Sequence, residues 1–170
     1  MHRINPFSIF LFVVLSSGYQ LLMSQNLQEV GGMIVDWTFA GDQIQFELVA
    51  PDDGWVGLGF NSQNDIVGTH LFLFSQDGET QRHSELVVKG VGNPVPVEKL
   101  YGKEAALDFP FTVKEEGGKT YVSFSLQAKA YPQYRTALKE GTELWLICAF
   151  SESDDFDHHS RMRKHIRVKL

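Results

Sequence analysis

Short runs in which apolar and polar residues alternate recur along this chain, and they constrain its fold more than any other feature. Residues 44–48, 122–126 and 166–170 each show this alternation. A period of two is typical of a half-buried β-strand. Turns that contain glycine separate the runs, at 40–42, 76–78 and 115–118. Many short strands with such turns between them predict an all-β fold, an antiparallel immunoglobulin-like β-sandwich of roughly ten strands.

The remaining segments fit the same fold class. Residues 144–150 are apolar on both faces, which is expected of a central strand. Only two short stretches, 131–139 and 97–106, are predicted as helical. Residues 89–96 contain so many glycines and prolines that we predict a long loop across one end of the sandwich, as a rim of a binding site or a plain connection.

The first 24 residues have the layout of a secretory signal. A basic start at Met1-His2-Arg3 precedes an apolar stretch at 9–15, and Ser24 is a small residue at a plausible cleavage point. Polar residues interrupt the ~20 apolar residues that a membrane span needs. We therefore expect cleavage before Gln25, no membrane span afterwards, and one secreted or periplasmic domain over residues 25–170.

Charge and cysteine content exclude several classes of protein. Arg3 is the only charged residue in 1–24, so the rest of the chain carries 14 basic and 21 acidic residues, a net charge of −7. This argues against nucleic acid or an anionic membrane as a partner. The single cysteine, Cys148, lies in an apolar run and is predicted to be a buried core residue. The domain must therefore be held together by its core alone.

Two segments indicate where a ligand would bind. Gly57 and Gly59 alternate in the run 54–60, and such a strand has a nearly bare face that another backbone or a flat ligand can approach closely. About a hundred residues later, His158 and His159 stand just before the last predicted strand. Together they predict a ligand site at one end of the sandwich.

Several motifs, taken in order, carry a resemblance to a known family over nearly all of residues 25–170. They are residues 35–37, 41–48, 54–61, 65–70, 71–74, 82–84 and 159–160. Their order and spacing resemble a DOMON domain, the module found at the N-terminus of dopamine β-monooxygenase and in extracellular b-type cytochromes. The resemblance implies a sandwich that binds heme b or a sugar-like ligand and performs no chemistry alone.

The resemblance also implies iron ligands. In heme-binding members, iron is held by a methionine in the loop after the Gly-Trp strand and by a histidine before the final strand. His159 matches the histidine position, whereas the methionine position falls on Ile66, which cannot bind iron. This departure removes the usual methionine–histidine pair.

His70 is the candidate replacement for that methionine. By alternation it shares a face with Phe72 and Phe74, where a buried imidazole needs a partner for each nitrogen. One interpretation is a bis-histidine heme site formed by His70 and His159. The other is a histidine at the rim of the sandwich that is hydrogen-bonded to backbone.

Adjacent histidines point in opposite directions in an extended chain, so at most one of His158 and His159 enters a pocket. The resemblance favours His159, whereas alternation counted back from Ile166 favours His158 unless a bulge shifts the phase. A solvated pair is the third interpretation. The nearby acidic run 154–157 is either a divalent-cation site or a solvated turn.

Other side chains keep two interpretations each. His165 is expected on the outward face, in a cationic stripe that is solvated or docks an acidic redox partner. Met162 is a core residue or a soft ligand. The three tryptophans are core residues, or one of them stacks on a sugar. The stripe consists of Arg161, Arg163, His165, Arg167 and Lys169, and the tryptophans are Trp37, Trp55 and Trp145.

The leading hypothesis is a secreted, non-catalytic module that binds heme b for electron transfer to a redox partner protein. His159 and His70 would be the axial ligands, and the pocket walls are then expected to include Ile66, Phe72, Phe74 and Trp55. The alternative is a heme-free carbohydrate-binding or adhesion sandwich. No catalytic arrangement is recognisable in the sequence, so we expect no enzyme activity.

Overall fold

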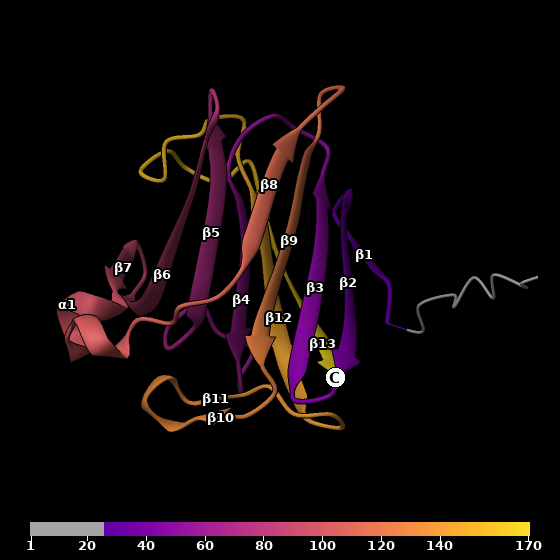
Figure 1. Cartoon of the computed structure of the whole chain (residues 1–170). Coiled ribbons are helices and arrows are strands. Elements are labelled where there is room, and N and C mark those ends of the chain that lie inside the picture. The colour runs from indigo at the N-terminus through magenta and orange to yellow at the C-terminus, as the bar shows by residue number, and fades with distance from the viewer. Residues whose placement is uncertain (1–25) are drawn as a thin grey trace, which may run out of the picture.

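Two antiparallel β-sheets face each other and enclose the core (Figure 1). This computed structural model describes residues 26–170, and the predicted leader at 1–24 lies outside them. The two main sheets contain five and six strands. The predicted antiparallel β-sandwich is therefore confirmed.

The five-stranded sheet has the order β1-β2-β3-β9-β8. The alternating runs at 44–48 and 122–126 lie in its two central strands, so these predictions are confirmed. Its strands are β1 (Gln28–Val30), β2 (Met33–Ala40), β3 (Gln43–Ala50), β8 (Phe111–Glu115) and β9 (Thr120–Gln127).

The six-stranded sheet has the order β13-β12-β4-β5-β6-β7. The apolar run 144–150 forms β12, between β13 and β4, as its two apolar faces predicted. The strands are β4 (Val56–Asn61), β5 (His70–Asp77), β6 (Thr80–Gly90), β7 (Asn93–Pro96), β12 (Glu143–Phe150) and β13 (Met162–Lys169).

Aromatic side chains fill the space between the sheets. Phe46 and Phe124 stack with ring centroids 5.1 Å apart, and Phe60 and Phe72 cross them from the six-stranded sheet. Cys148 is fully buried in the same core, and this burial raises the pKa of its thiol to about 12. The cysteine is thus the buried core residue that the sequence predicted.

Three local predictions were wrong or only partly right. Residues 89–96 are not a long loop, because β6 continues to Gly90 and pairs with β7. Prolines are tolerated there because β7 is an edge strand. Residues 131–139 form the short strands β10 (Ala130–Tyr131) and β11 (Thr136–Ala137) around a 3-10 turn at Pro132–Tyr134. Within 97–106, helix α1 covers only Val97–Tyr101, followed by a 3-10 turn at Lys103–Ala105.

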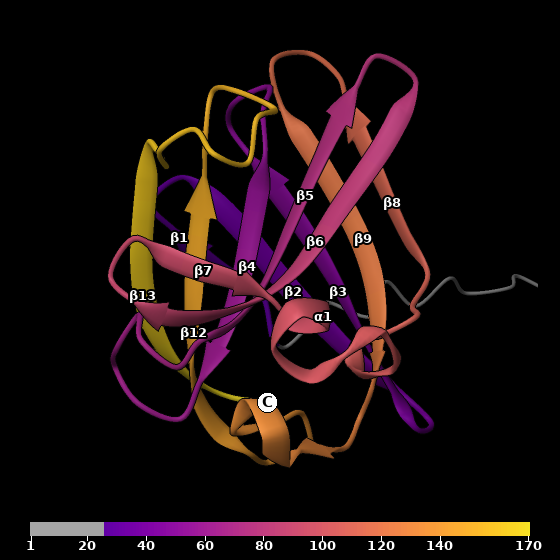
Figure 2. The same ribbon diagram turned by 90° about the vertical axis from the view of Figure 1, so that its left-hand side faces the viewer.

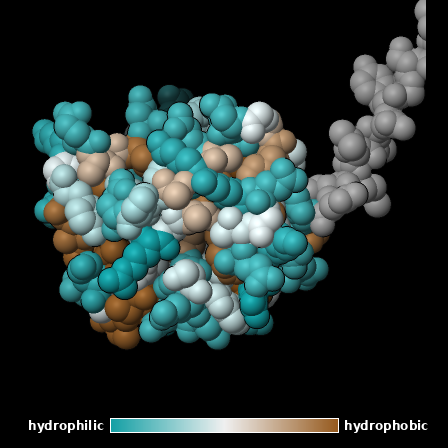
Figure 3. All heavy atoms as spheres, turned by 90° about the horizontal axis from the view of Figure 1, so that it is seen from below, coloured by the Kyte–Doolittle hydropathy of each residue, from teal (hydrophilic) through white to brown (hydrophobic). Residues whose placement is uncertain are grey.

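Two loops lie at opposite ends of the six-stranded sheet. The upper loop, residues 151–161, joins β12 to β13, and the lower loop, residues 62–69, joins β4 to β5. Figures 1 and 2 show the upper loop at one end of the molecule, with β10 and β11 at the other. Viewed from that other end, the surface is mainly hydrophilic, with separate apolar patches (Figure 3).

Candidate functional site

The six-stranded sheet is apolar on its outer face as well as toward the core. Its register places Gly57 beside Leu73 and Ala149, and Gly59 beside Leu71 and Ile147. These positions alternate with core-facing residues such as Val56 and therefore point away from the core. We call this surface the outer apolar face. Its residues are Trp55, Gly57, Gly59, Leu71, Leu73, Leu86, Ile147 and Ala149.

The glycine strip on this face is filled by the chain itself. A Cβ atom on Gly59 would lie 2.5 Å from Thr69 Cγ2 and 3.2 Å from Ile147 Cβ. On Gly57 it would lie 2.9 Å from Leu73 Cδ2. The glycines are thus required by close packing of neighbouring side chains. The expectation of a bare strip for a flat ligand is corrected, because Leu73 and Thr69 take up that space.

The upper loop is fastened to this face through Trp55. The Trp55 indole Nε1 donates to the His158 carbonyl at 3.2 Å, and the Trp55 amide donates to the Ser153 carbonyl at 3.0 Å. Phe156 of the loop packs against the small cluster formed by Trp55, Leu73, Leu86 and Ala149. The loop therefore covers the end of the outer apolar face with an aromatic side chain.

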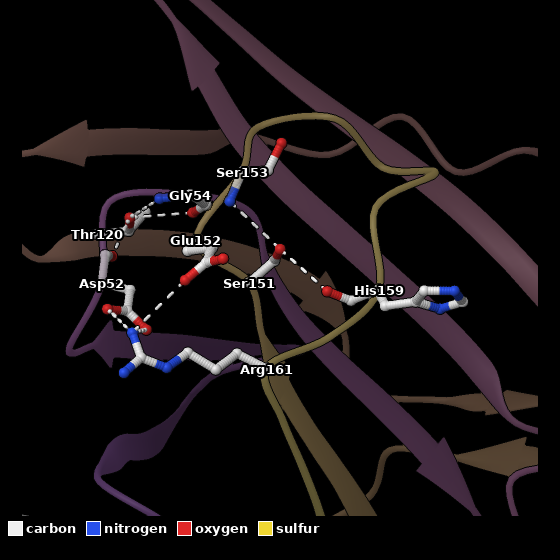
Figure 4. A network of polar contacts seen from close by, with 8 residues as sticks. All are labelled: Asp52, Gly54, Thr120, Ser151, Glu152, Ser153, His159 and Arg161. Carbon is white, nitrogen blue, oxygen red and sulfur yellow. Dashed lines mark hydrogen bonds and ion pairs between the residues drawn. The ribbon is translucent and has the colours of Figure 1, made fainter.

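Both histidines of the upper loop are exposed. The His158 Nδ1 atom lies 3.0 Å from the Ser151 hydroxyl, which fixes that ring beside the loop backbone. The Ser151 hydroxyl also donates to the His159 carbonyl at 3.2 Å. The His159 imidazole points away from this polar network (Figure 4). Of these two histidines, His158 is therefore the one whose ring is held by the loop's own hydrogen bonds.

The lower loop is held from inside by Asn61. Its amide nitrogen donates to the Asp65 carbonyl at 2.7 Å and to the Val67 carbonyl at 3.1 Å. Ile66, between them, is half-buried. The loop therefore presents an apolar side chain at the position where the resemblance implies methionine.

His165 lies on β13 opposite Ile147, so it shares the outward face as predicted. Its Nδ1 atom lies 2.9 Å from Asn64 Oδ1, which ties β13 to the lower loop. Burial and the neighbouring Arg163 charge lower the pKa of the His165 imidazole. Of the cationic stripe on this strand, Arg161 pairs with Asp52 and Arg167 pairs with Glu143.

His70 is the first residue of β5, at the lower end of the sandwich, and it is fully buried on the core side of the sheet. Its Nε2 atom is 2.7 Å from Glu85 Oε1, and the Tyr134 ring lies with its centroid 4.3 Å away. The other Glu85 oxygen accepts the Leu107 amide at 2.7 Å. The expected hydrogen bond from His70 to backbone is therefore wrong, because its partner is a buried carboxylate.

Burial has a second consequence for His70. Its Nδ1 atom has no hydrogen-bond partner, so a protonated ring would leave a buried N–H unpaired. This burial lowers the pKa of His70, although Glu85 opposes the shift. Glu85 was missed in the sequence. The only available signal was the position of this carboxylate next to the apolar run Leu86–Val88. The register between β5 and β6 places Glu85 opposite Phe72, on the core side.

The structure does not bring His70 and His159 together. His70 pairs with Phe60, whereas the upper loop begins beyond Phe150, which pairs with Val56 at the other end of β4. Four strand residues separate these levels, about 13 Å. His70 also faces the core, and the loop covers the outer side. Two axial nitrogens on one iron would lie only ~4 Å apart, given bonds of ~2 Å.

The predicted pocket walls are divided in the same way. Phe72 and Phe74 are fully buried between the sheets, whereas Trp55 belongs to the cluster on the outer apolar face. Ile66 lies in the lower loop. These four side chains therefore do not line one pocket.

The remaining candidates have plain structural roles. Met162 packs against the core and lies against Gly31, where a Cβ would be 3.0 Å from its Cγ. Trp37 is buried, and Trp145 is half-buried on the outward side of β12. Across residues 26–170, no group of three or more His, Cys, Asp or Glu side chains is placed to hold a metal ion. Within the same residues, no helix is long and apolar enough to cross a membrane.

Comparison with known proteins shows the fold and does not identify a ligand or a function. The cytochrome b domain of pyranose dehydrogenase from Coprinopsis cinerea is similar, with a TM-score of 0.59, 12% identity, and coverage of 81% of this chain and 76% of that one. The cytochrome domain of Myriococcum thermophilum cellobiose dehydrogenase gives a TM-score of 0.54, 13% identity, and coverage of 87% and 78%. No family model matches the chain, and no curated protein sequence matches it. The DOMON resemblance is thus confirmed at the level of the fold.

Proposed function

We propose that this chain is an exported, non-catalytic binding module whose ligand lies against the outer apolar face, between the upper and lower loops. The observation that carries the proposal is the burial of apolar side chains on both faces of one sheet. An antiparallel sheet commonly leaves one face to water, so a second apolar face needs a cover, and here the chain itself buries all of that face except Leu71, which is half-buried. Loops cover part of it here, and they carry His159 on one side and Ile66 on the other.

Heme b is the first candidate ligand. The similar structures are cytochrome domains of two dehydrogenases, which supports a module of this general kind. The residues fit a heme held through one histidine, His159. They do not fit the bis-histidine site, because His70 is hydrogen-bonded to Glu85 in the core. Ile66 supplies no second ligand.

A bound heme would supply one-electron redox chemistry. The chain's own residues have other tasks in this proposal. His159 provides a nitrogen ligand, and Leu71 with Phe156 provides apolar surface that excludes water. The basic residues on the outward side of β13 that form no ion pair within residues 26–170, Arg163 and Lys169, give an otherwise acidic protein a cationic edge toward an acidic redox partner.

An absorbance spectrum of the protein, recorded before and after reduction and after hemin is added, tests the proposal. We expect a Soret band that is lost in His159→Ala and kept in His165→Ala, the matched control. A His70→Gln variant should keep the band, because His70 is not a ligand here. A band that survives His159→Ala would contradict the assignment, and a flat spectrum with added hemin would exclude heme.

A carbohydrate is the second candidate, and one observation favours it. Trp37 and Trp55 are buried, but Trp145 is half-buried on the outward side of the six-stranded sheet, where a ring could stack on a sugar. If the spectrum is flat, a sugar-binding screen should find a ligand whose affinity drops in Trp145→Ala. Unchanged affinity in that variant would contradict the stacking role.

A further inference from the structure

Two carboxyl groups meet where the upper loop touches the edge of the five-stranded sheet. Glu115 ends β8, and Asp154 lies in the upper loop close enough for the two carboxyl groups to interact. Glu115 Oε1 and Asp154 Oδ1 are both shielded from solvent, and neither has a donor. Two ionised carboxylates would repel each other there, whereas one shared proton would satisfy both oxygens.

No lysine, arginine or histidine side chain forms an ion pair with either carboxylate in the part of the chain that the structure describes. Arg82 Nη2 donates to the backbone carbonyl of Asp154 at 2.8 Å, and its guanidinium lies over the Phe156 ring. Arg161 pairs with Asp52 and with Glu152. Asp53 adds a further negative charge near Glu115. Figure 4 shows Arg161 engaged with Asp52 and Glu152 on the neighbouring side of the loop.

We propose that Glu115 and Asp154 form a proton-dependent latch, which holds the upper loop on β8 while the two carboxyl groups share a proton and loosens it when both are ionised. The loop carries Phe156 and His159, so the latch would regulate access to the outer apolar face. Only this consequence rests on the proposed function, because the latch itself concerns the ligand-free chain.

The direction of the pH dependence follows from protonation in the two states. Burial first, and then the charge of Asp154, raise the pKa of Glu115 to about 7 in the closed loop, from an ordinary value of 4.5. An opened loop returns Glu115 to that ordinary value. Between pH 4.5 and 7 the closed state holds more protons than the open one, so closure weakens as pH rises and levels off above 7.

Hydrogen exchange of the whole, ligand-free protein measures this opening. Amides in the tip of the loop, 153–158, are compared with those in β2 and β3, after correction for the intrinsic pH dependence of exchange. We expect the protection of the tip to fall by roughly tenfold for each pH unit over this range, as an upper limit set by one proton. β2 and β3 should show no such change.

Glu115→Gln should abolish this dependence, because its amide can donate to Asp154 at every pH. Glu116→Gln is the matched control: it removes the adjacent, exposed charge and should leave the dependence intact. Asp53→Asn leaves the pair in place but removes a negative charge near Glu115. The pH above which protection of the loop tip stops falling should therefore be lower in this variant. Wild-type protection that does not change with pH, or a Glu115→Gln variant that behaves as wild type, would overturn the latch. The second outcome would assign the dependence to His158 or His159, which remain in that variant.

Discussion

The outer faces of the two sheets follow the same alternation of residues, but they differ in what lies on them. On the five-stranded sheet the outward positions are polar or exposed, and they include Thr38, Glu47 and Lys114. Tyr121 there is 39% exposed. On the six-stranded sheet, by contrast, Leu73 is 5% exposed and Ile147 is 1% exposed. Within residues 26–170, the upper loop is fastened over the second face, through Trp55 and Phe156.

The five-stranded sheet therefore packs apolar side chains on its inner face alone. The six-stranded sheet packs them on both faces, so it borders two cores. All six residues of β4 are buried, because its even positions pack on the five-stranded sheet and its glycines pack under neighbouring side chains. A second, small core on an outer face adds buried apolar area and so stabilises the fold. Substitutions on the two faces should therefore have different effects.

The largest difference is expected for the aromatic side chains. Trp55→Ala should lower the free energy of unfolding by about 3 kcal/mol, since it empties the small outer core and removes the indole bond to the upper loop. Tyr121→Ala, on the five-stranded sheet, should cost less than about 1 kcal/mol. Urea unfolding of both variants checks this, and equal losses would contradict a second core.

The second-largest effect on stability is expected from overpacking at the glycine strip, Gly57 and Gly59. Gly59→Ala is expected to cost about 2 kcal/mol, because the new methyl group meets Thr69, which is fully buried and cannot move away. Gly90→Ala is the matched control, since its Cβ would find the nearest atom 4.0 Å away. Thermal unfolding compares the two. A Gly59→Ala variant as stable as wild type would contradict the close packing of Thr69 against this strip.

The buried His70 should add a pH dependence from the inner core. Because burial lowers the pKa of His70 below its usual 6.5, the unfolded state takes up a proton first as pH falls. The stability contributed by neutral His70 is present above pH 6.5 and is lost below it. Unfolding measured from pH 5 to 8 should show a smaller rise with pH in His70→Gln than in wild type. An identical rise, with His159→Ala as the surface control, would contradict this role.

The smallest effect is expected on the polar outer face. Lys114 and Glu116 form a surface ion pair with both side chains 66% exposed. Removing it by Lys114→Gln should change the free energy of unfolding by less than about 0.5 kcal/mol, because water screens the charges. Urea unfolding in low and high salt measures the change. A larger loss would show that this face, too, takes part in a stabilising network.

How far the sequence could be used is clearest at particular residues. Alternation correctly placed β3 and β9, because side-chain direction in a strand depends only on local geometry. The continuous apolar run 144–150 correctly predicted β12 and the burial of Cys148. The glycine and proline content of 89–96 misled, because it could not show that β7 would be an edge strand. The face shared by His70 and Phe72 was predictable, whereas the carboxylate that His70 meets was not. Glu85 lies 15 residues away and reaches it only through strand pairing.

By itself, then, the sequence determined the strand pattern and the buried cysteine, since each depends on residues close together in the chain. It also determined the similarity to a sandwich family, through the order of motifs along the chain. The tertiary structure alone decided that His70 and His159 lie near opposite ends of one sheet. It also decided that Glu115 meets Asp154 across the two sheets. The physical reason is register: which strands pair, and at which residues, fixes distances between side chains that no local pattern contains.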